Sequence, residues 1–261
     1  MDESREQRGC NAGYWSRIRD THLTEWYDLD AFRAGGCSLS SVEVDAVGDV
    51  TGKRLLHLQC NCGIDTLSWA RRGAVVTGVD LSDRCIDSAQ SLAGELEIDA
   101  RFICCDVLSL DEVLPETFDI VFASYGVFCW IDDVPRWMRV AARHLVPGGL
   151  LFHIDGHPIL WTCDDDDDAA VSYFHDPVPF ASEPDDAPGM TVYEWQWTVA
   201  DIVNAAIDAG LRIERLCEYP FITYDFGEPY ISDEPGRWRM PGAPDKPLML
   251  SVAARRRLVG E

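Results

Sequence analysis

The sequence predicts an α/β protein built on a mostly parallel sheet with helices on both faces. Three observations lead to this prediction. Short apolar runs alternate with amphipathic segments from about residue 53 onward. Capping residues stand where the expected helices begin, and apolar residues make up 47% of the 261 positions. This alternation is typical of strands joined by right-handed helical crossovers in one doubly wound sheet.

The apolar runs are short enough to be strands buried on both faces rather than helices. Seven strands are expected, at residues 53–59, 74–79, 101–105, 118–124, 150–154, 211–219 and 248–254. A tight turn is expected at Pro147-Gly148-Gly149, just before the fifth strand.

The connecting helices are recognised by their ends. One helix is expected over residues 64–72 because Gly73 can end it, and another after Ser82, a common N-cap residue. Asp132, Asp133 and Pro135 open a third helix, which should turn Trp137, Met138, Ala141 and Leu145 toward the sheet. Thr198 and Asp201 resemble a capping box that starts a fourth.

The chain divides into four parts within one domain. Residues 1–50 are expected to be an N-terminal cap segment, 51–156 the cofactor-binding half, 157–197 an acidic lid or insertion, and 198–261 the C-terminal half. Periodicity stops in the lid, where long irregular segments are often functional. Its five-aspartate run, Asp164 to Asp168, is interpreted as a solvated loop tip rather than a cation site.

The formal net charge of −23 limits the partners. Only Lys53 and Lys246 are lysines, and affinity for nucleic acid depends on basic side chains, so nucleic acid is excluded as a partner. The acid either adapts the surface to concentrated salt, which we favour, or suits cationic partners. No apolar run reaches transmembrane length and the start is not signal-like, so a cytoplasmic protein without membrane insertion is expected. The oligomeric state is not predicted.

The ten cysteines do not predict a metal site. No C-x-x-C pair occurs; Cys60 and Cys62 are separated by one residue, and Cys104 and Cys105 are adjacent. In a cytosolic chain such cysteines are most often small buried apolar residues. We therefore expect no metal.

The candidate site follows from the sheet, because ligands of open parallel sheets bind beyond the carboxyl ends of the strands. The residues at those ends are Gln59 to Gly63, Asp80-Leu81, Asp106-Val107, Ser124-Tyr125 and Asp155 to His157. Asp80 follows the first turn by about twenty residues, the spacing at which a carboxylate accepts hydrogen bonds from ribose hydroxyls.

These motifs together resemble one family. The stretches LLHLQCNCGIDTLSWARRGA, VTGVDLS, CCDVL, FDIVFASYGVFCW, LVPGGLLFHIDGHP and IVNAAIDAGL occur in family order over roughly residues 40–255. The chain thus resembles class I S-adenosylmethionine-dependent methyltransferases of the small-molecule type, akin to the quinone-methylating branch. The resemblance implies a Rossmann-like fold of seven strands with the last strand antiparallel, and a small-molecule methyl acceptor.

The first motif departs from the family pattern of one acid and three glycines. His57 stands at the position of the acid, Gln59 and Asn61 replace two glycines, and Gly63 keeps the third. Bare backbone amides are needed around a pyrophosphate, whereas S-adenosylmethionine contains no pyrophosphate. Its amino-acid tail can be bound by side-chain amides, with close approach required only at Gly63.

The resemblance assigns the remaining cofactor contacts. It implies that Gln59, Asn61 and Gly63 surround the methionine portion of S-adenosylmethionine, and that Ser124 lies near the sulfonium or the tail. Asp80 would hold the ribose, Leu81 would line the adenine, Asp106 would accept from the adenine amino group, and the Val107 amide would lie beside it. His57 is interpreted first as a packed core residue.

The acceptor side is less defined. His153, Asp155 and His157 alternate along the fifth strand, so they could share one face, and a metal triad is the less favoured alternative. His157 is the predicted catalytic base, with Tyr125 as a second catalytic candidate and Trp130 as a pocket residue. The resemblance implies that the aromatic N-terminal segment with Tyr14, Trp15, Trp26 and Tyr27 folds over the cofactor, and that the excursion at 221–247 completes the acceptor pocket.

Two other functions share this frame. One is a non-enzymatic S-adenosylmethionine-binding protein that keeps the cofactor pocket but lacks acceptor chemistry. The other is a nicotinamide-dependent oxidoreductase, which is disfavoured because the glycines that approach a pyrophosphate are missing.

Overall fold

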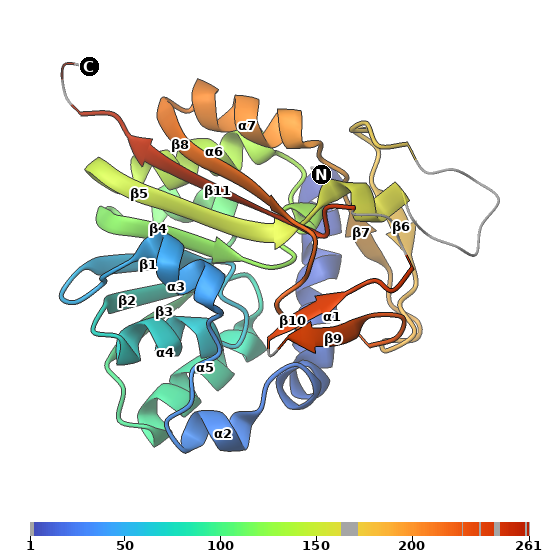
Figure 1. Cartoon of the computed structure of the whole chain (residues 1–261), viewed down its shortest axis with the longest axis horizontal. Helices are drawn as coiled ribbons and strands as arrows, with labels where there is room; N and C mark the ends of the chain where they lie inside the picture. Colours follow the sequence, from blue (N-terminus) through green and yellow to red (C-terminus); the bar gives the residue numbers. More distant parts are fainter. Residues whose placement is uncertain are drawn as a thin grey trace.

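The computed structural model describes residues 3–162, 172–225, 227–234, 236–242, 246–258 and 260, with no side-chain description for 233 and 234. Seven strands form the central sheet in the order β3-β2-β1-β4-β5-β11-β8 (Figure 1). Their bounds are β1 Arg54–Leu58, β2 Val75–Asp80, β3 Ala100–Cys104, β4 Phe118–Ser124, β5 Leu145–Gly156, β8 Leu211–Tyr219 and β11 Met249–Arg256.

The strand directions confirm the predicted fold class. Neighbouring strands from β3 to β5 pair in parallel. β11 is inserted between β5 and β8 and is antiparallel to both. The order reverses between β1 and β4, so a crevice opens at the carboxyl ends of these strands.

Helices cover both faces of the sheet, as expected. α3 (Ser41–Val47), α4 (Ile64–Arg71) and α5 (Asp83–Glu95) lie on one face, where α3 and α4 share a core with β1, β2, β4 and β5 and α5 packs against β3. α6 (Val134–Arg143) and α7 (Val199–Asp208) lie on the other, with the 3-10 turn η1 (Val107–Glu112).

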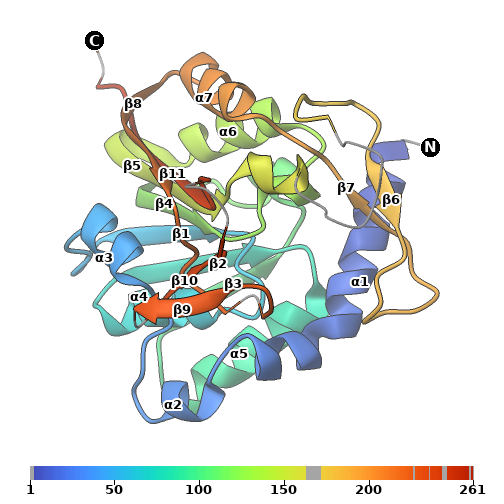
Figure 2. The same ribbon diagram turned by 45° about the vertical axis from the view of Figure 1, so that its right-hand side comes forward.

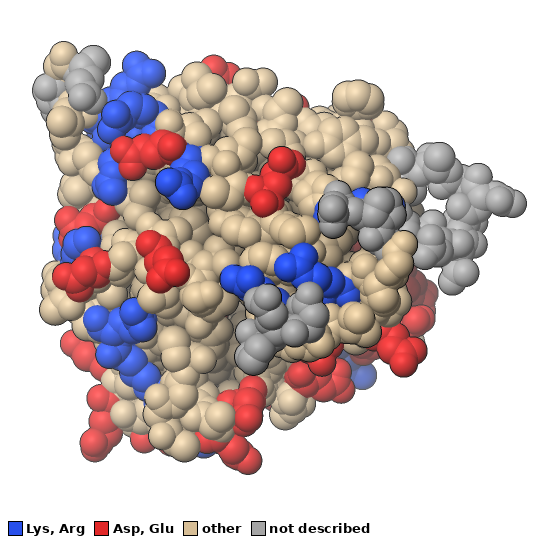
Figure 3. Space-filling view, viewed as in Figure 1, with Lys and Arg blue, Asp and Glu red and all other residues tan. Residues whose placement is uncertain are grey.

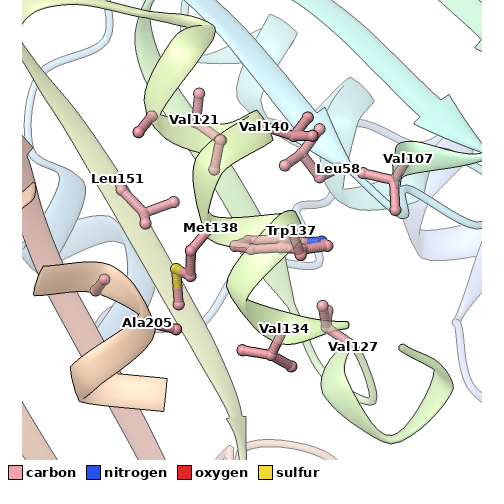
Figure 4. Close-up of a cluster of buried hydrophobic side chains, with 14 of the residues drawn as sticks. Leu58, Val107, Val121, Val127, Val134, Trp137, Met138, Val140, Leu151 and Ala205 are labelled. Atoms are coloured by element: carbon pink, nitrogen blue, oxygen red, sulfur yellow. The ribbon is translucent and has the colours of Figure 1, made fainter. Parts of the chain in front are cut away.

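α6 carries three of the four apolar residues that the sequence predicts on it. Trp137, Met138 and Ala141 have no exposed surface; Leu145 is equally buried but begins β5 instead of lying on the helix. Figure 4 shows the Trp137 and Met138 side chains of α6 among Leu58, Val121 and Leu151 of the sheet and Ala205 of α7. The Asp133 carboxylate accepts a hydrogen bond from Arg136 N at 2.8 Å and caps the helix. This packing fixes the loop before α6 next to the strand ends.

The helix starts were predicted well, but the start of β5 was not. Ser82 caps α5, and Thr198 and Asp201 form a capping box at α7. The expected turn at 147–149 lies inside β5, which begins at Leu145 rather than residue 150. The β4–β5 register shifts between Phe118 and Ile120, so the Pro-Gly-Gly segment is accommodated as an irregularity in the ladder.

Five segments lie over the carboxyl ends of the parallel strands (Figures 1 and 2). They are α1 (Glu3–Glu25), the hairpin of β6 (Phe180–Ser182) and β7 (Val192–Glu194), the hairpin of β9 (Ile231–Glu234) and β10 (Arg237–Arg239), and the short turns η2 (Phe128–Trp130) and η3 (Pro158–Thr162). α2 (Leu29–Arg33) connects α1 to the sheet. Within the predicted lid, the structure describes η3, β6 and β7, and Asp164 to Asp168 lie outside the described residues.

None of the helices in the described ranges combines the length and apolar character needed to cross a bilayer. The nine described cysteines are all free thiols. Cys60, Cys62 and Cys85 are buried as expected, whereas Cys10, Cys37 and Cys104 are exposed.

Candidate active site

A cavity of about 1090 Å³ lies between the strand ends and the covering segments. Nine of the ten site residues predicted from the sequence line it: Gln59, Asn61, Asp80, Leu81, Asp106, Val107, Ser124, Tyr125 and His157. The tenth, Gly63, does not. The four N-terminal aromatic residues and part of the 221–247 excursion also line the cavity, on its opposite wall. The sheet topology and the covering segments therefore converge on one cavity.

Asp80 ends β2 and is held by two backbone amides. Asn61 N donates to Oδ2 at 2.8 Å and Ser82 N donates to Oδ1 at 2.9 Å. Burial raises the pKa of Asp80, while these amides act in the opposite direction. Each oxygen keeps a further lone pair, so the carboxylate can accept two hydroxyl donors from the cavity. Leu81 lies beside it on the cavity wall.

Asp106 follows β3 and connects the strand ends to α1. Its Oδ1 accepts from Leu108 N at 2.9 Å, and its Oδ2 accepts from Arg8 Nε at 3.0 Å. Arg8 also donates to Asp132 Oδ2 at 2.6 Å. One arginine of α1 thus bridges two carboxylates. The Arg8 guanidinium thus donates to the Asp106 carboxylate, to which the resemblance expects an adenine amino group to donate. The neighbouring Val107 is almost fully buried.

The turn after β1 keeps a glycine-like backbone without the glycines. Gln59 and Asn61 have φ of 55° and 48°, in the left-handed region that costs non-glycine residues on the order of 1–3 kcal/mol. The Gln59 amide donates to Val127 O at 3.1 Å and accepts from Trp137 Nε1 at 2.8 Å. Both polar atoms of Gln59 therefore hold the protein together, which leaves Asn61 as the better candidate for a side-chain contact with a ligand.

Gly63 has a packing reason to be glycine. It caps α4 with φ of 79°, and a Cβ there would lie 2.7 Å from the Ala89 Cβ and 2.8 Å from the Phe102 ring. The packing of α5 and β3 against this turn therefore leaves no room for a side chain at residue 63. The predicted close approach of a ligand at Gly63 stays a prediction.

Asp65, in the first turn of α4, was not predicted as a site residue. Its side chain lines the cavity and is only 8% exposed. Ser38 Oγ donates to Oδ1 at 2.5 Å and Ser124 Oγ donates to Oδ2 at 3.2 Å. Its position two residues after Gly63 was the available signal, but an acid in a first helical turn is common for dipole reasons alone.

Glu43 lies next to Asp65 and is buried outside the cavity lining. Burial and the Asp65 charge raise the pKa of Glu43 well above its ordinary value, despite a 2.6 Å hydrogen bond from Ser40 N. Two neighbouring buried carboxyls do not both ionise readily. Burial raises the pKa of Asp65 as well, against hydrogen bonds from Ser38 and Ser124, so the pair favours a single negative charge, and Asp65 is the member that faces the cavity.

His57 is neutral where the family pattern has an acid. Its Nδ1 lies 2.8 Å from Thr66 Oγ1, and burial lowers its pKa to about 3. Nε2 is buried without a partner among the described residues, and the residue belongs to the cavity wall. The carboxylate on this side of the cavity is therefore supplied by Asp65 of α4 instead of by β1.

His153, Asp155 and His157 have separate contacts: Asp155 and His157 line the cavity, whereas His153 lies behind it with Nε2 3.7 Å from Asp155 Oδ2. His153 has no exposed surface and packs on the Phe128 ring at 4.2 Å, and burial lowers its pKa to about 4. Asp155 accepts from Gly126 N at 2.5 Å and Val127 N at 2.9 Å and so fixes the loop after β4. Across the described ranges, no group of three His, Cys, Asp or Glu residues is arranged to hold a metal ion.

His157 lines the cavity with both ring nitrogens engaged. Ile159 N donates to Nδ1 at 3.1 Å, and Nε2 lies 2.9 Å from Glu218 Oε1. With Nδ1 as an acceptor, Nε2 carries the proton and donates to Glu218. In this geometry neither nitrogen is free to take a proton from a substrate, so the catalytic assignment stays a prediction that the contacts do not favour.

Tyr125 links the end of β4 to the segment after β8. It has φ of 53°, and its hydroxyl lies 2.6 Å from Thr223 Oγ1. Burial raises the pKa of Tyr125 well above its ordinary value, so the phenol stays neutral. Trp197, at the start of the helix after the lid, donates from Nε1 to Ile131 O at 2.8 Å. Both residues thus have structural contacts as well as a place on the cavity wall.

Comparison with known proteins identifies a matching domain. The family described as "Methyltransferase domain" matches residues 56–153. A ubiquinone biosynthesis O-methyltransferase of Neisseria meningitidis is 32% identical over 111 residues, which is 42% of this chain and 46% of that protein. One of Pseudomonas entomophila is 30% identical over 139 residues, or 53% of this chain and 56% of that protein. The matches thus span about half the length of these relatives.

Solved structures share the fold at low identity. An S-adenosylmethionine-dependent methyltransferase of Mesorhizobium loti superposes with a TM-score of 0.58 and 22% identity, covering 81% of this chain and 94% of that one. A structure described as a DhpI-SAM-HEP complex has a TM-score of 0.60 and 15% identity, covering 98% and 99%. These likenesses show the fold.

Proposed function

We propose that this chain transfers a methyl group from S-adenosylmethionine to a small molecule. Its residues 56–153 match a methyltransferase domain. Its fold is that of S-adenosylmethionine-dependent methyltransferases. The observation that carries the proposal is Asp80 at the rim of the cavity, with two oxygens held by amides and lone pairs left for ribose hydroxyls. Asp106 follows the adjacent strand, where the adenine would lie.

The residues along the cavity fit the cofactor from end to end. Asp80 and Leu81 suit the ribose and adenine, and the carboxylate of Asp65 suits the ammonium of the amino-acid tail. The buried Nε2 of His57 is a polar atom that a ligand could satisfy. A pyrophosphate fits less well, because Gln59 and Asn61 place side chains where bare amides would be needed. This disfavours the nicotinamide alternative.

The bound cofactor supplies an already activated methyl group. The chain then has to position, align and exclude water. Arg8 holds α1 over the cavity through its ion pairs with Asp106 and Asp132. The Tyr125 hydroxyl holds the segment after β8 there through its hydrogen bond with Thr223. Of the two catalytic candidates proposed from the sequence, Tyr125 and His157, His157 is the weaker, because both of its ring nitrogens have protein partners.

The acceptor is a small molecule in this proposal, supported by the ubiquinone O-methyltransferases among the relatives. The division into a cap at 1–50, a cofactor half at 51–156, a lid at 157–197 and a C-terminal half at 198–261 belongs to the same proposal. So does a cytoplasmic protein with a salt-adapted surface, for which the net charge of −23 is the support.

Thermal unfolding in molar salt tests the function. S-adenosylhomocysteine should raise the melting temperature, whereas NAD should leave it unchanged. Methyl release from S-adenosylmethionine across a panel of small acceptors then separates an enzyme from a binding protein. A melting temperature that does not respond to millimolar S-adenosylhomocysteine would exclude the proposed function.

A further inference from the structure

One wall of the cavity is formed by α1, η2 and the β6–β7 hairpin. The Asn11 side chain of α1 donates from Nδ2 to Tyr193 O at 2.7 Å and accepts from Tyr193 N at 2.9 Å. Trp195 N donates to Cys129 O at 2.8 Å. Glu194, between these two anchors, is thereby fixed on the cavity wall.

The Glu194 carboxyl has no hydrogen bond or ion pair to any described residue, and burial raises its pKa to about 7. A partly buried carboxylate without a donor is unfavourable. The cost falls if a ligand in the cavity brings a donor or a positive charge. Glu194 differs in this respect from Asp80, Asp106 and Asp155, which all accept hydrogen bonds from the protein.

Aromatic rings line the adjoining part of the wall, because they belong to α1 and η2, which both contact β7. Tyr14 stacks on Trp130 with ring centroids 5.9 Å apart, and Trp15 meets Trp130 edge-on at 5.3 Å. The Tyr14 hydroxyl donates to Asp186 Oδ2 at 3.2 Å. Aromatic faces attract organic cations, most strongly where water is excluded. Rings and an unpaired carboxylate together make a surface suited to a cation.

The charge inside the cavity points the same way. Of the described residues that line it, nine are Asp or Glu and one, Arg8, is Lys or Arg. Arg8 is taken by Asp106 and Asp132. The three lining histidines have lowered pKa values, mainly through burial: about 4 for His22, about 3 for His57, and below the ordinary value for His157. No described cation in the wall is free to bind an acidic acceptor.

The surface charge does not account for these acids. In Figure 3, acidic side chains gather along the lower edge of the molecule, and basic ones gather near the C-terminal strands and the β9–β10 hairpin. Adaptation to salt acts on groups that face bulk solvent. It gives no reason for an unpaired Glu194 on the wall of a cavity among aromatic rings.

We propose that the methyl acceptor is a small organic cation, an amine with an aromatic or planar group, whose positive charge lies between the Tyr14 and Trp130 rings and the Glu194 carboxylate. This rests on the proposed function and deepens it by naming the substrate class. Glu194 recognises the charge; the methylated atom is a separate matter.

The test uses three probes of one size and different charge: 2-phenylethylamine, 2-phenylethanol and 3-phenylpropionate. Each is titrated by calorimetry into the full chain in molar KCl, with and without saturating S-adenosylhomocysteine. The amine should bind at least about tenfold more tightly than the alcohol, in line with a desolvated cation–π contact and a charge-assisted hydrogen bond. The propionate should not bind measurably.

Two variants separate local recognition from overall charge. Glu194→Gln should reduce amine affinity to that of the alcohol and leave S-adenosylhomocysteine affinity unchanged. Asp185→Asn removes one charge from an exposed site on the same lid, outside the cavity wall, and should change neither. Equal affinities for the three probes, or equal effects of the two variants, would overturn the inference.

The outcomes also distinguish the two proposals. A chain that binds S-adenosylhomocysteine without preferring the amine keeps the proposed function and loses the inference. A chain that prefers the amine through Glu194 but does not bind S-adenosylhomocysteine keeps the cation site and loses the methyltransferase assignment.

Discussion

The two walls of the cavity are built by different means. On the strand side, Asp80, Asp106 and Ser124 stand where parallel strands end, and backbone amides or α4 hold their side chains. On the covering side, Arg8, Tyr14 and Glu194 come from a helix and a hairpin far away in sequence. The residues of the strand wall follow from the order and direction of the strands. Those of the covering wall depend on where α1 and the β6–β7 hairpin pack in the folded chain. The first suits a shared cofactor and the second an individual acceptor.

The strand wall gives the largest expected effect. In the proposed function, Asp80 accepts hydrogen bonds from both ribose hydroxyls, and each charge-assisted hydrogen bond is worth about 1.5–3 kcal/mol. Asp80→Ala would remove both. The variant should lose at least about 100-fold in affinity for both S-adenosylhomocysteine and 5′-methylthioadenosine, which lacks the amino-acid tail. Calorimetry measures both. Retained binding of 5′-methylthioadenosine would show that Asp80 does not hold the ribose.

Asp65 sharpens the comparison within the strand wall. Asp65→Asn should reduce S-adenosylhomocysteine affinity by about tenfold or more, because one charge-assisted contact with the tail ammonium is lost. Affinity for 5′-methylthioadenosine should not change. The matched control is Glu43→Gln, the neighbouring carboxyl outside the cavity lining. Equal losses for the two ligands would remove Asp65 from the tail site.

Glu43 should show a pH-dependent effect on stability. Its folded-state pKa lies above the ordinary value of about 4.5, so the unfolded chain releases this proton first as the pH rises. Stability contributed by the protonated group is therefore lost between the ordinary and the raised pKa. Glu43→Gln should gain melting temperature relative to wild type at pH 8 and show little difference near pH 4.5. A difference that is constant with pH would contradict the raised pKa.

His157 should give the smallest effect. A general base contributes about 10²–10⁴-fold to the rate, but both ring nitrogens of His157 already have protein partners. With an acceptor found in the panel, we expect His157→Gln to change kcat by less than about threefold, well short of the loss of a general base. A drop of two orders of magnitude would restore His157 as the base that the sequence predicted.

The order of elements was predictable because each signal was local. Ser82 and Thr198 mark helix starts by short-range hydrogen bonds, and buried strands show as apolar runs. Asp80 and Asp106 follow from those strands. The Pro147-Gly149 segment misled, because a break in local pattern is the same for a turn and for an irregular strand.

The contacts of the site depended on long-range structure. Gln59 looked like a ligand-binding amide, yet it is used by Val127 and Trp137, and the Trp137 contact is 78 residues distant in sequence. Arg8 reaches Asp106 across 98 residues, which no local pattern encodes. Glu194 could be singled out only from the structure, because its carboxyl lies on the cavity wall without a hydrogen bond or ion pair to any described residue.

A crystal structure of the chain with S-adenosylhomocysteine tests the central claim most directly. We expect both ribose hydroxyls within hydrogen-bonding distance of the Asp80 carboxylate, the adenine beside Leu81 and Asp106, and the tail ammonium on Asp65. A ligand bound elsewhere, with no contact to Asp80, would refute the proposed cofactor site and leave only the architecture of the sheet.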